Sequence, residues 1–257
     1  MKIASFNVNS IRAHLENVLN WANVSKPDII LLQELKCEEH CFPFMDFEML
    51  GYNIQILGQK SWNGVAVLSK HRIEDVYEHL PCVEDTSRYL EVFTGGIRVA
   101  SIYAPNGNPT GTEKFAYKLK WMECLENRMR ELAKLEEPVI IGGDFNVIPK
   151  DMDVYNPKLF KDDAVMQPEI RKAFADLQTF GFKSAKEILY PQKVMYSYWD
   201  YRFGARQNNK GILLDFFLLN QKAQDLLKDF YVEDAPRDQP KSSDHTAIVL
   251  ELNQPLS

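Results

Sequence analysis

Short apolar runs, rich in β-branched and aromatic residues and bounded by turn residues, recur along the whole chain. This pattern is typical of β-strands. The predicted strands cover residues 2–8, 28–33, 53–57, 65–69, 89–93, 97–103, 139–145, 196–200, 212–219 and 247–252.

One long segment, residues 112–135, has the apolar spacing of an amphipathic helix instead. Its apolar side chains recur every three or four residues, and charged side chains occupy the other face. Weaker helical patterns cover residues 12–24, 43–50, 168–179 and 221–229. Because most strands follow one another without an intervening helix, the pattern disfavours a regular βαβ array and favours two packed sheets flanked by helices, an α/β (α+β) fold.

Composition is that of an ordinary globular protein. The chain has 257 residues, of which 45% are hydrophobic and 26% charged, which suits one large domain or two small ones. It contains no apolar run approaching the roughly 18 residues of a membrane span. The N-terminus becomes polar too early for a secretory signal, so we expect a cytoplasmic protein with no membrane partner.

The net charge of −6 and the pI near 5.5 restrict how the chain could bind nucleic acid. Proteins that hold nucleic acid by their overall charge are usually basic. Any such contact here must therefore come from a local patch. Carboxylates gathered around a bound cation are one source of an acidic balance.

The four cysteines are Cys37, Cys41, Cys82 and Cys124. Their irregular spacing in a long chain does not indicate a disulfide framework. Cys37, His40 and Cys41 lie close together, as zinc ligands do, but a second pair at finger spacing is missing. A reduced loop is the favoured interpretation.

Polar side chains adjoin six of the predicted strands. For most of them an ordinary structural role is available: Asp144 could cap a turn, Asp244 could form an Asx-turn, and His245 could be a hydrogen-bonded core residue. Asp215 is different, because an unpaired carboxylate inside an aliphatic strand costs several kcal/mol. The full set is Asn7, Glu34, Tyr103, Asp144, Asn146, Asp215, Asp244 and His245.

These side chains could share the cost of burial if the strand ends met at one edge. The carboxylates would then hold a hard cation, and the histidine would pair with a carboxylate. Oxygen ligands without cysteine favour Mg²⁺, with Mn²⁺ as a substitute, over Zn²⁺. Magnesium sites commonly combine one or two carboxylates with substrate phosphate, so the pattern indicates phosphoryl transfer or phosphodiester hydrolysis.

Seven motifs occur together and in order: FNVNSIRA, LLQELK, YAPNG, GGDFNVIPKDMDVYNP, YSYWDYR, LLDFFLL and SSDHTAIV. In this respect the chain resembles the exonuclease III family of apurinic/apyrimidinic (AP) endonucleases, over essentially its whole length. The resemblance implies one domain over residues 1–257, a four-layer αββα sandwich with two mixed sheets face to face, and a flexible tail at the last few residues. It also implies a Mg²⁺-dependent repair phosphodiesterase that cuts 5′ to abasic sites and trims 3′ ends.

The resemblance assigns metal and water chemistry to four residues. Glu34 is similar to the principal metal ligand, with Asn7 beside it, and Asp244 resembles a carboxylate near a metal. Asp144 resembles the aspartate that orients or deprotonates the attacking water.

The resemblance also assigns phosphate binding, to the side-chain amides of two asparagines and to the phenol of one tyrosine. Asn146 and Tyr103 resemble phosphate ligands, and Asn106 of the YAPNG motif is a substrate contact. His245 resembles the histidine that stabilises the pentacovalent phosphate, supported by Asp215.

The chain departs from the family pattern at two positions. Leu213 stands where an arginine commonly precedes the buried aspartate, and Leu35 stands where a threonine usually follows the glutamate. These changes put the support of Asp215 and one hydrogen bond near Glu34 in question.

Residues 196–211, YSYWDYRFGARQNNKG, mix aromatic and basic side chains. Such a mixture suits gripping the DNA backbone and stacking on bases, and Trp199, Arg202 and Arg206 are the candidate contacts. A solvated hairpin loop is the alternative. The resemblance further places the walls of a pocket for the abasic sugar at Tyr198, Ile212 and Leu214, although a plain core role competes for Leu214.

The implied partner is double-stranded DNA with abasic sites or blocked 3′ ends, bound by a monomer. Two alternatives stay open. One is a phosphodiesterase of the same wider fold that acts on a lipid, an inositol phosphate or a nucleotide. The other is a DNA-binding module without activity, which the complete set of polar residues disfavours.

Overall fold

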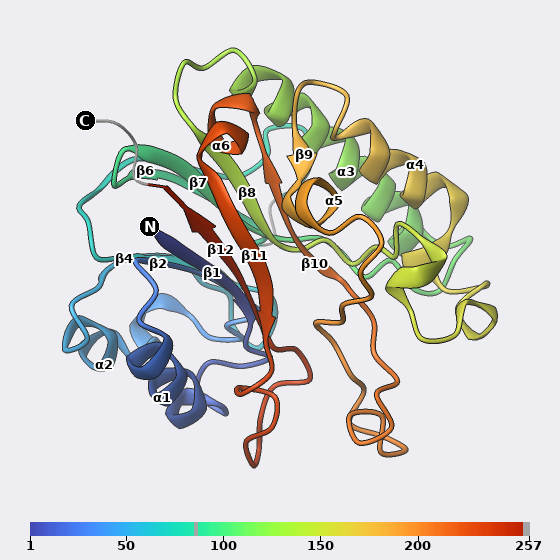
Figure 1. The fold of residues 1–257 in the computed structure, drawn as a ribbon, viewed down its shortest axis with the longest axis horizontal. Helices are drawn as coiled ribbons and strands as arrows, with labels where there is room; N and C mark the ends of the chain where they lie inside the picture. The colour runs from blue at the N-terminus through green and yellow to red at the C-terminus, as the bar shows by residue number, and fades with distance from the viewer. Residues whose placement is uncertain (85–86, 254–257) are drawn as a thin grey trace.

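The computed structural model describes residues 1–84 and 87–253, and within them two six-stranded β-sheets form the centre of the molecule (Figure 1). The first sheet contains, in spatial order, β11 (Leu227–Glu233), β12 (Ala247–Leu252), β1 (Lys2–Asn7), β2 (Ile29–Gln33), β4 (Val65–Ser69) and β3 (Asn53–Leu57). The second contains β5 (Ile73–Glu78), β6 (Tyr89–Thr94), β7 (Ile97–Tyr103), β8 (Val139–Asp144), β10 (Asp215–Leu219) and β9 (Lys183–Ser184).

Both sheets are mixed. β1 and β2 run parallel, as do β7 and β8, and their other neighbours are antiparallel. The central strands are buried on both faces, which explains why their sequences are almost continuously apolar.

Successive residues of the strands serve opposite faces of each sheet. Ile3 of β1 and Leu31 of β2 pack between the two sheets, together with Val99 of β7 and Phe217 of β10. The neighbouring side chains, such as Phe6, pack outward against a helix. The sheets are therefore stacked face to face.

Helices cover the two outer faces. α1 (Leu15–Ser25) and α2 (Phe44–Glu48) pack on the first sheet, whereas α3 (Glu113–Leu132) and α4 (Pro168–Asp176) pack on the second (Figure 1). Two short helices, α5 (Ala185–Leu189) and α6 (Gln221–Leu226), lie near β10. The predicted four-layer αββα sandwich is confirmed.

Several predicted elements differ from the structure. Residues 227–229, predicted as the end of a helix, begin β11, because the chain there pairs with β12. Residues 196–200 are irregular and make only isolated bridges, from Tyr198 to Ile212 and His245. β10 starts at Asp215 rather than at residue 212, and β5 and β9 were not predicted.

The cysteines differ as well. Cys82 and Cys124 form a disulfide, with 5.7 Å between their Cα atoms, because the packing of α3 brings together residues 42 apart in sequence. The spacing of the cysteines did not indicate this pair. Cys37 and Cys41 are free thiols, as the reduced-loop interpretation requires.

Two remaining expectations concern the end of the chain and the membrane. The predicted tail falls on residues 254–257, which lie outside the described residues. None of the helices in the described part of the chain has the length and apolar character that crossing a bilayer needs.

Candidate active site

The polar strand ends meet at one end of the two sheets. The parallel strands β1, β2, β7 and β8 end there, and the antiparallel β10 and β12 begin there. Asp144 is paired in register with both Tyr103 and Asp215. The topology thus gathers residues that lie far apart in the sequence.

A cavity of about 240 Å³ opens at this end. Ten residues named from the sequence line it: Glu34, Tyr103, Asn106, Asp144, Asn146, Tyr198, Ile212, Leu214, Asp244 and His245. Asn7 and Asp215 are fully buried and hydrogen-bonded to this lining.

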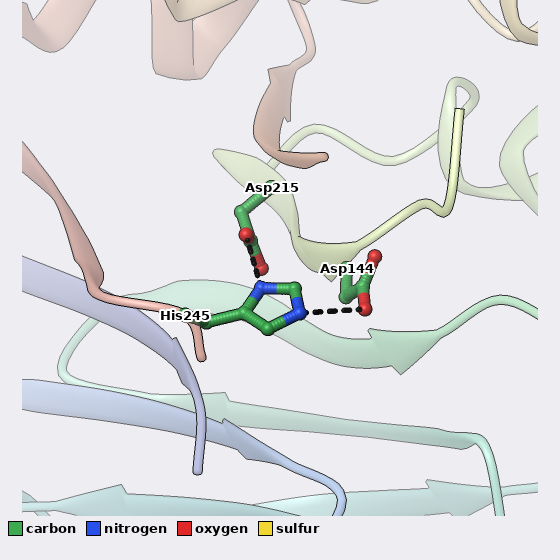
Figure 2. Close-up of side chains that lie close together, drawn as sticks. All are labelled: Asp144, Asp215 and His245. Atoms are coloured by element: carbon green, nitrogen blue, oxygen red, sulfur yellow. Dashed lines mark hydrogen bonds and ion pairs between the residues drawn. The ribbon is translucent and has the colours of Figure 1, made fainter. Parts of the chain in front are cut away.

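His245 lies between two carboxylates (Figure 2). Its Nδ1 is 2.8 Å from Asp215 Oδ2, and its Nε2 is 3.7 Å from Asp144 Oδ2. Since a carboxylate only accepts hydrogen bonds, Nδ1 carries the proton in the bond to Asp215. Burial lowers the pKa of His245, but the charge of Asp215 more than compensates and raises it to about 10. The ring is therefore an imidazolium at neutral pH.

Asp144 is buried at the end of β8. Burial raises its pKa to about 7, against the opposing effect of His245. Asn7 Nδ2 and the Asn146 N–H donate to its two oxygens at 3.0 and 2.8 Å. A carboxylate with a pKa near neutrality, held in place and facing a cavity, is suited to accept a proton from water.

The glycine pair before Asp144 gives the backbone the room it needs. A Cβ on Gly143 would lie 2.0 Å from the carbonyl oxygen of Ile102, and one on Gly142 would lie 2.5 Å from Phe217. These glycines thus permit a close approach of the backbone at the strand end.

Asp215 is supported by Ser197, which the sequence analysis did not identify. Ser197 Oγ donates to Asp215 Oδ2 at 2.6 Å and accepts from the N–H groups of Leu214 and Asp215 at 3.2 Å. Leu213, in place of the usual arginine, points instead into the core beneath β10. Besides the His245 ring, the side-chain partner of Asp215 is thus a neutral hydroxyl.

A second acidic group lies around Glu34. Asn7 Nδ2 donates to Glu34 Oε1 at 2.9 Å, and Lys36 Nζ lies 2.9 Å from Oε2. Burial raises the pKa of Glu34, but Lys36 and Asn7 together bring it below its usual value. Asn9 connects this group to Asp244, because it bonds both Lys36 and Asp244. Leu35, the second departure, is fully buried in the core beside α1.

The oxygens of Glu34 and Asp244 face the same cavity, with the Asn7 carboxamide beside Glu34. An all-oxygen set of this kind fits a hard divalent cation. Asp144, Asp215 and His245 also bring their ligand atoms within 4.8 Å of one another. Because both ring nitrogens of His245 already face carboxylates, that trio is better described as an ion-paired relay than as a metal site.

Two uncharged side chains, those of Tyr103 and Asn146, line the cavity together with Asp144. Burial, and then the charges of Glu34 and Asp144, raise the pKa of Tyr103 far above its usual value, so it remains a protonated phenol. The Asn146 backbone is left-handed, with φ of 48°, and its Nδ2 donates to the carbonyl oxygen of Ala104 at 2.9 Å. The second N–H of this amide makes only a long bond, 3.4 Å, to Asp144 Oδ2. That N–H and the Tyr103 hydroxyl can donate hydrogen bonds to an anion in the cavity.

The opposite wall is apolar. Ile212 and Leu214 pack in one small cluster with Val154, Ile148 and Val165, and Tyr198 packs against it. Phe160 and Val165 also line the cavity, as does Asp163. Sequence reasoning missed these three, because they lie in the irregular segment between β8 and α4, where no periodicity or motif singles them out.

The three predicted DNA contacts, Trp199, Arg202 and Arg206, do not line the cavity. Trp199 is buried beneath Arg206, whose guanidinium lies 4.3 Å from the ring centroid. Arg206 is held by Asp234 and Asp238 at 3.0 and 2.8 Å. Arg202 is paired with the neighbouring Asp200. Their segment and residues 234–243 form two loops that project at the same end of the molecule (Figure 1, bottom).

Comparison with known proteins agrees with this geometry. The chain is 30% identical to exodeoxyribonuclease III of Haemophilus influenzae, over 98% of this chain and all of that protein. Its fold matches the solved structure of an AP endonuclease from Archaeoglobus fulgidus, with a TM-score of 0.94 and 34% identity over 98% and 99% of the two chains. A 3′ phosphatase from Neisseria bound to product DNA hairpin matches with a TM-score of 0.95 and 31% identity, again over 98% and 99%.

The resemblance to exonuclease III-type enzymes that the motifs indicate is thereby confirmed. A family model also matches residues 4–245, a range that includes every polar residue of the cavity. The chain belongs to the Endonuclease/Exonuclease/phosphatase family.

Proposed function

We propose that this protein is a Mg²⁺-dependent DNA-repair phosphodiesterase that cleaves the backbone 5′ to abasic sites and also trims 3′ ends. The observation that carries the proposal is the cavity itself. One cavity of about 240 Å³ is lined by the Asp144–His245 pair, by the neutral side chains of Tyr103, Asn106 and Asn146, and by apolar side chains. Exonuclease III and AP endonuclease relatives support DNA as the substrate.

Cleavage begins with the attack of water on the phosphorus atom. Asp144 accepts the proton of this water, since its pKa of about 7 allows it to be ionised yet basic at neutral pH. The bond from phosphorus to the 3′ oxygen on the 5′ side of the abasic site breaks, and the leaving oxygen keeps the bonding electrons and takes a proton from solvent to become a 3′-hydroxyl. His245 places a positive charge beside the phosphate as negative charge develops there. Asp215 fixes the orientation of the ring through Nδ1 and keeps it protonated.

The remaining polar residues bind the phosphate and its counter-ion. Asn146 and Asn106 donate from their amides, and Tyr103 donates from its phenol. Glu34 and Asp244 would hold Mg²⁺, with Asn7 orienting Glu34. When bound, Mg²⁺ supplies additional stabilisation of the charge on the phosphate.

Selection of an abasic site follows from the apolar wall. An abasic nucleotide has no base edge to read, so steric exclusion is the remaining physical route. Tyr198, Ile212 and Leu214, extended by Phe160 and Val165, form an apolar wall, to which we assign the exclusion of a base and the acceptance of a deoxyribose. An abasic site also costs less to unstack, which adds to the selectivity.

The test uses three substrates with and without Mg²⁺. These are a duplex with one abasic site, a duplex with a 3′-phosphate end, and an inositol polyphosphate. Cleavage of the abasic duplex and release of the 3′-phosphate support the proposal, whereas turnover of the inositol phosphate alone would favour the alternative of a non-DNA phosphodiesterase. A protein that binds the abasic duplex but cleaves none of the three would be a binding module.

A further inference from the structure

A lysine is buried beneath the phosphate-binding wall. Lys118 lies in the second turn of α3, and its side chain has no exposed surface. A buried ammonium is costly unless it is compensated. Among the described residues no carboxylate lies within ion-pair distance of it, and burial lowers its pKa to about 7 despite the charges of Asp144 and Asp163. Packing alone therefore does not explain why a lysine is buried at this position.

The ammonium group joins two loops of the site. Lys118 Nζ donates to the carbonyl oxygen of Asn106 at 3.0 Å and to that of Asn146 at 2.5 Å. Asn106 follows β7 and Asn146 follows β8, and both residues line the cavity. One side chain therefore sets the spacing of two residues whose amides we assign to phosphate binding.

The adjoining glycine is shaped to this lysine. Gly107 has φ of +83°, and a Cβ placed on it would lie 2.5 Å from Cδ of Lys118. The loop after β7 can close on the lysine side chain only because residue 107 has no side chain. This close contact is specific to Gly107, because Gly111 in the same loop has φ of +73° and nothing within 4 Å of an added Cβ.

Asn146 is held by three contacts. Its backbone is left-handed, a conformation that asparagine adopts more readily than most residues other than glycine. Its N–H bonds Asp144, its carboxamide bonds Ala104, and its carbonyl accepts from Lys118. The lysine is the member of this set that reaches across from an outer helix.

We propose that Lys118 is a positioning residue, which holds the amides of Asn106 and Asn146 at the separation that the reacting phosphate requires. The proposal rests on the phosphodiesterase function proposed above. Lys118 does not touch the substrate. It acts through the two carbonyl groups that it bonds.

The first test is Lys118→Met, which keeps the length of the side chain and removes the donor. We expect kcat for cleavage of an abasic duplex to fall by about 10–100-fold, as for a small displacement of a catalytic group, with KM nearly unchanged. Lys120→Met is the control, since Lys120 is half-exposed on the same helix and pairs with Glu123. It should match the wild type.

A double variant separates positioning from a purely structural role of Lys118, because only positioning makes the loss of kcat depend on Asn146. Lys118→Met combined with Asn146→Ala should lower kcat by no more than about twofold beyond Asn146→Ala alone, because the lysine acts through that amide and through Asn106. Fully multiplicative losses would overturn the proposal.

A second pair of variants keeps the lysine and moves the loop. Gly107→Ala forces a Cβ against Lys118, whereas Gly111→Ala carries the same strain of positive φ in open space. We expect the loss of kcat in Gly107→Ala only, even if Lys118→Met does not fold. Wild-type kcat in Gly107→Ala would overturn the proposal. If the wild-type protein itself leaves the abasic duplex intact, the proposed function fails, and this inference fails with it.

Discussion

Ser197 offers the sharpest test of how the site is held together. Its hydroxyl donates to the buried carboxylate of Asp215 and accepts from two backbone N–H groups. Ser197→Ala removes a hydrogen bond to a charged group, about 1.5–3 kcal/mol, and leaves buried N–H groups with one partner fewer. We expect a total loss of about 2–4 kcal/mol in the free energy of unfolding.

The matched control is Ser184→Ala. Ser184 is also buried, in β9 beside β10, but its hydroxyl has no hydrogen-bond partner among the residues that the structure describes. Removing an unsatisfied hydroxyl should leave stability within about 0.5 kcal/mol or increase it. Two buried serines of equal size thus have opposite expected outcomes.

The assay is urea unfolding of both variants, followed by cleavage of an abasic duplex. A loss of 2–4 kcal/mol corresponds to a fall of about 1–2 M in the urea midpoint, for a slope of about 2 kcal/mol/M. We also expect kcat of Ser197→Ala to fall about tenfold, which is 1.36 kcal/mol of transition-state stabilisation. If both variants show the same stability and the same kcat, Ser197 does not replace the missing arginine at position 213.

Three further outcomes test the roles assigned in the cavity. Asp144→Asn should lower kcat by about 10²–10⁴-fold and leave binding of abasic DNA intact or tighter, because a negative charge beside phosphate is removed; equal losses of rate and affinity would contradict this role. The rate should fall below pH about 7, as Asp144 gains a proton, and at high pH, as His245 loses one near 10. Asp215→Asn removes the charge that raises the pKa of His245, so the alkaline fall should move to lower pH; an unmoved profile would be contrary to the assignment. Ile212→Ala and Phe160→Ala should each lower the ratio of cleavage at an abasic site to cleavage at a paired nucleotide, and an unchanged ratio in both would exclude steric selection by this wall.

The sequence was most informative where topology forces residues together. Glu34, Asp144 and Asp215 could be identified because each adjoins an apolar run, and strands that are neighbours in a sheet bring such positions to one edge. The motif order then supplied the roles of these residues. The same reasoning gave the two sheets, since the apolar runs of their central strands are unbroken.

Features that depend on contacts between distant loops could not be predicted in this way. Arg206, predicted to contact DNA, is also paired with Asp234 and Asp238 from a loop about 30 residues away, and the local sequence gives no sign of this pairing. The local sequence around Phe160 carries no periodicity that would place it in the cavity. Likewise, residues 227–229 are compatible with a helix until β12 is present to pair with them.

The central claim is that this cavity hydrolyses the DNA backbone beside an abasic site with the help of Mg²⁺. The most direct measurement incubates a 5′-labelled duplex carrying one abasic site with the protein, in EDTA and after Mg²⁺ is restored. We expect a single cut on the 5′ side of the abasic site, leaving a 3′-hydroxyl end, only when Mg²⁺ is present. An intact strand with Mg²⁺, or full cleavage in a verified metal-free sample, would contradict the account.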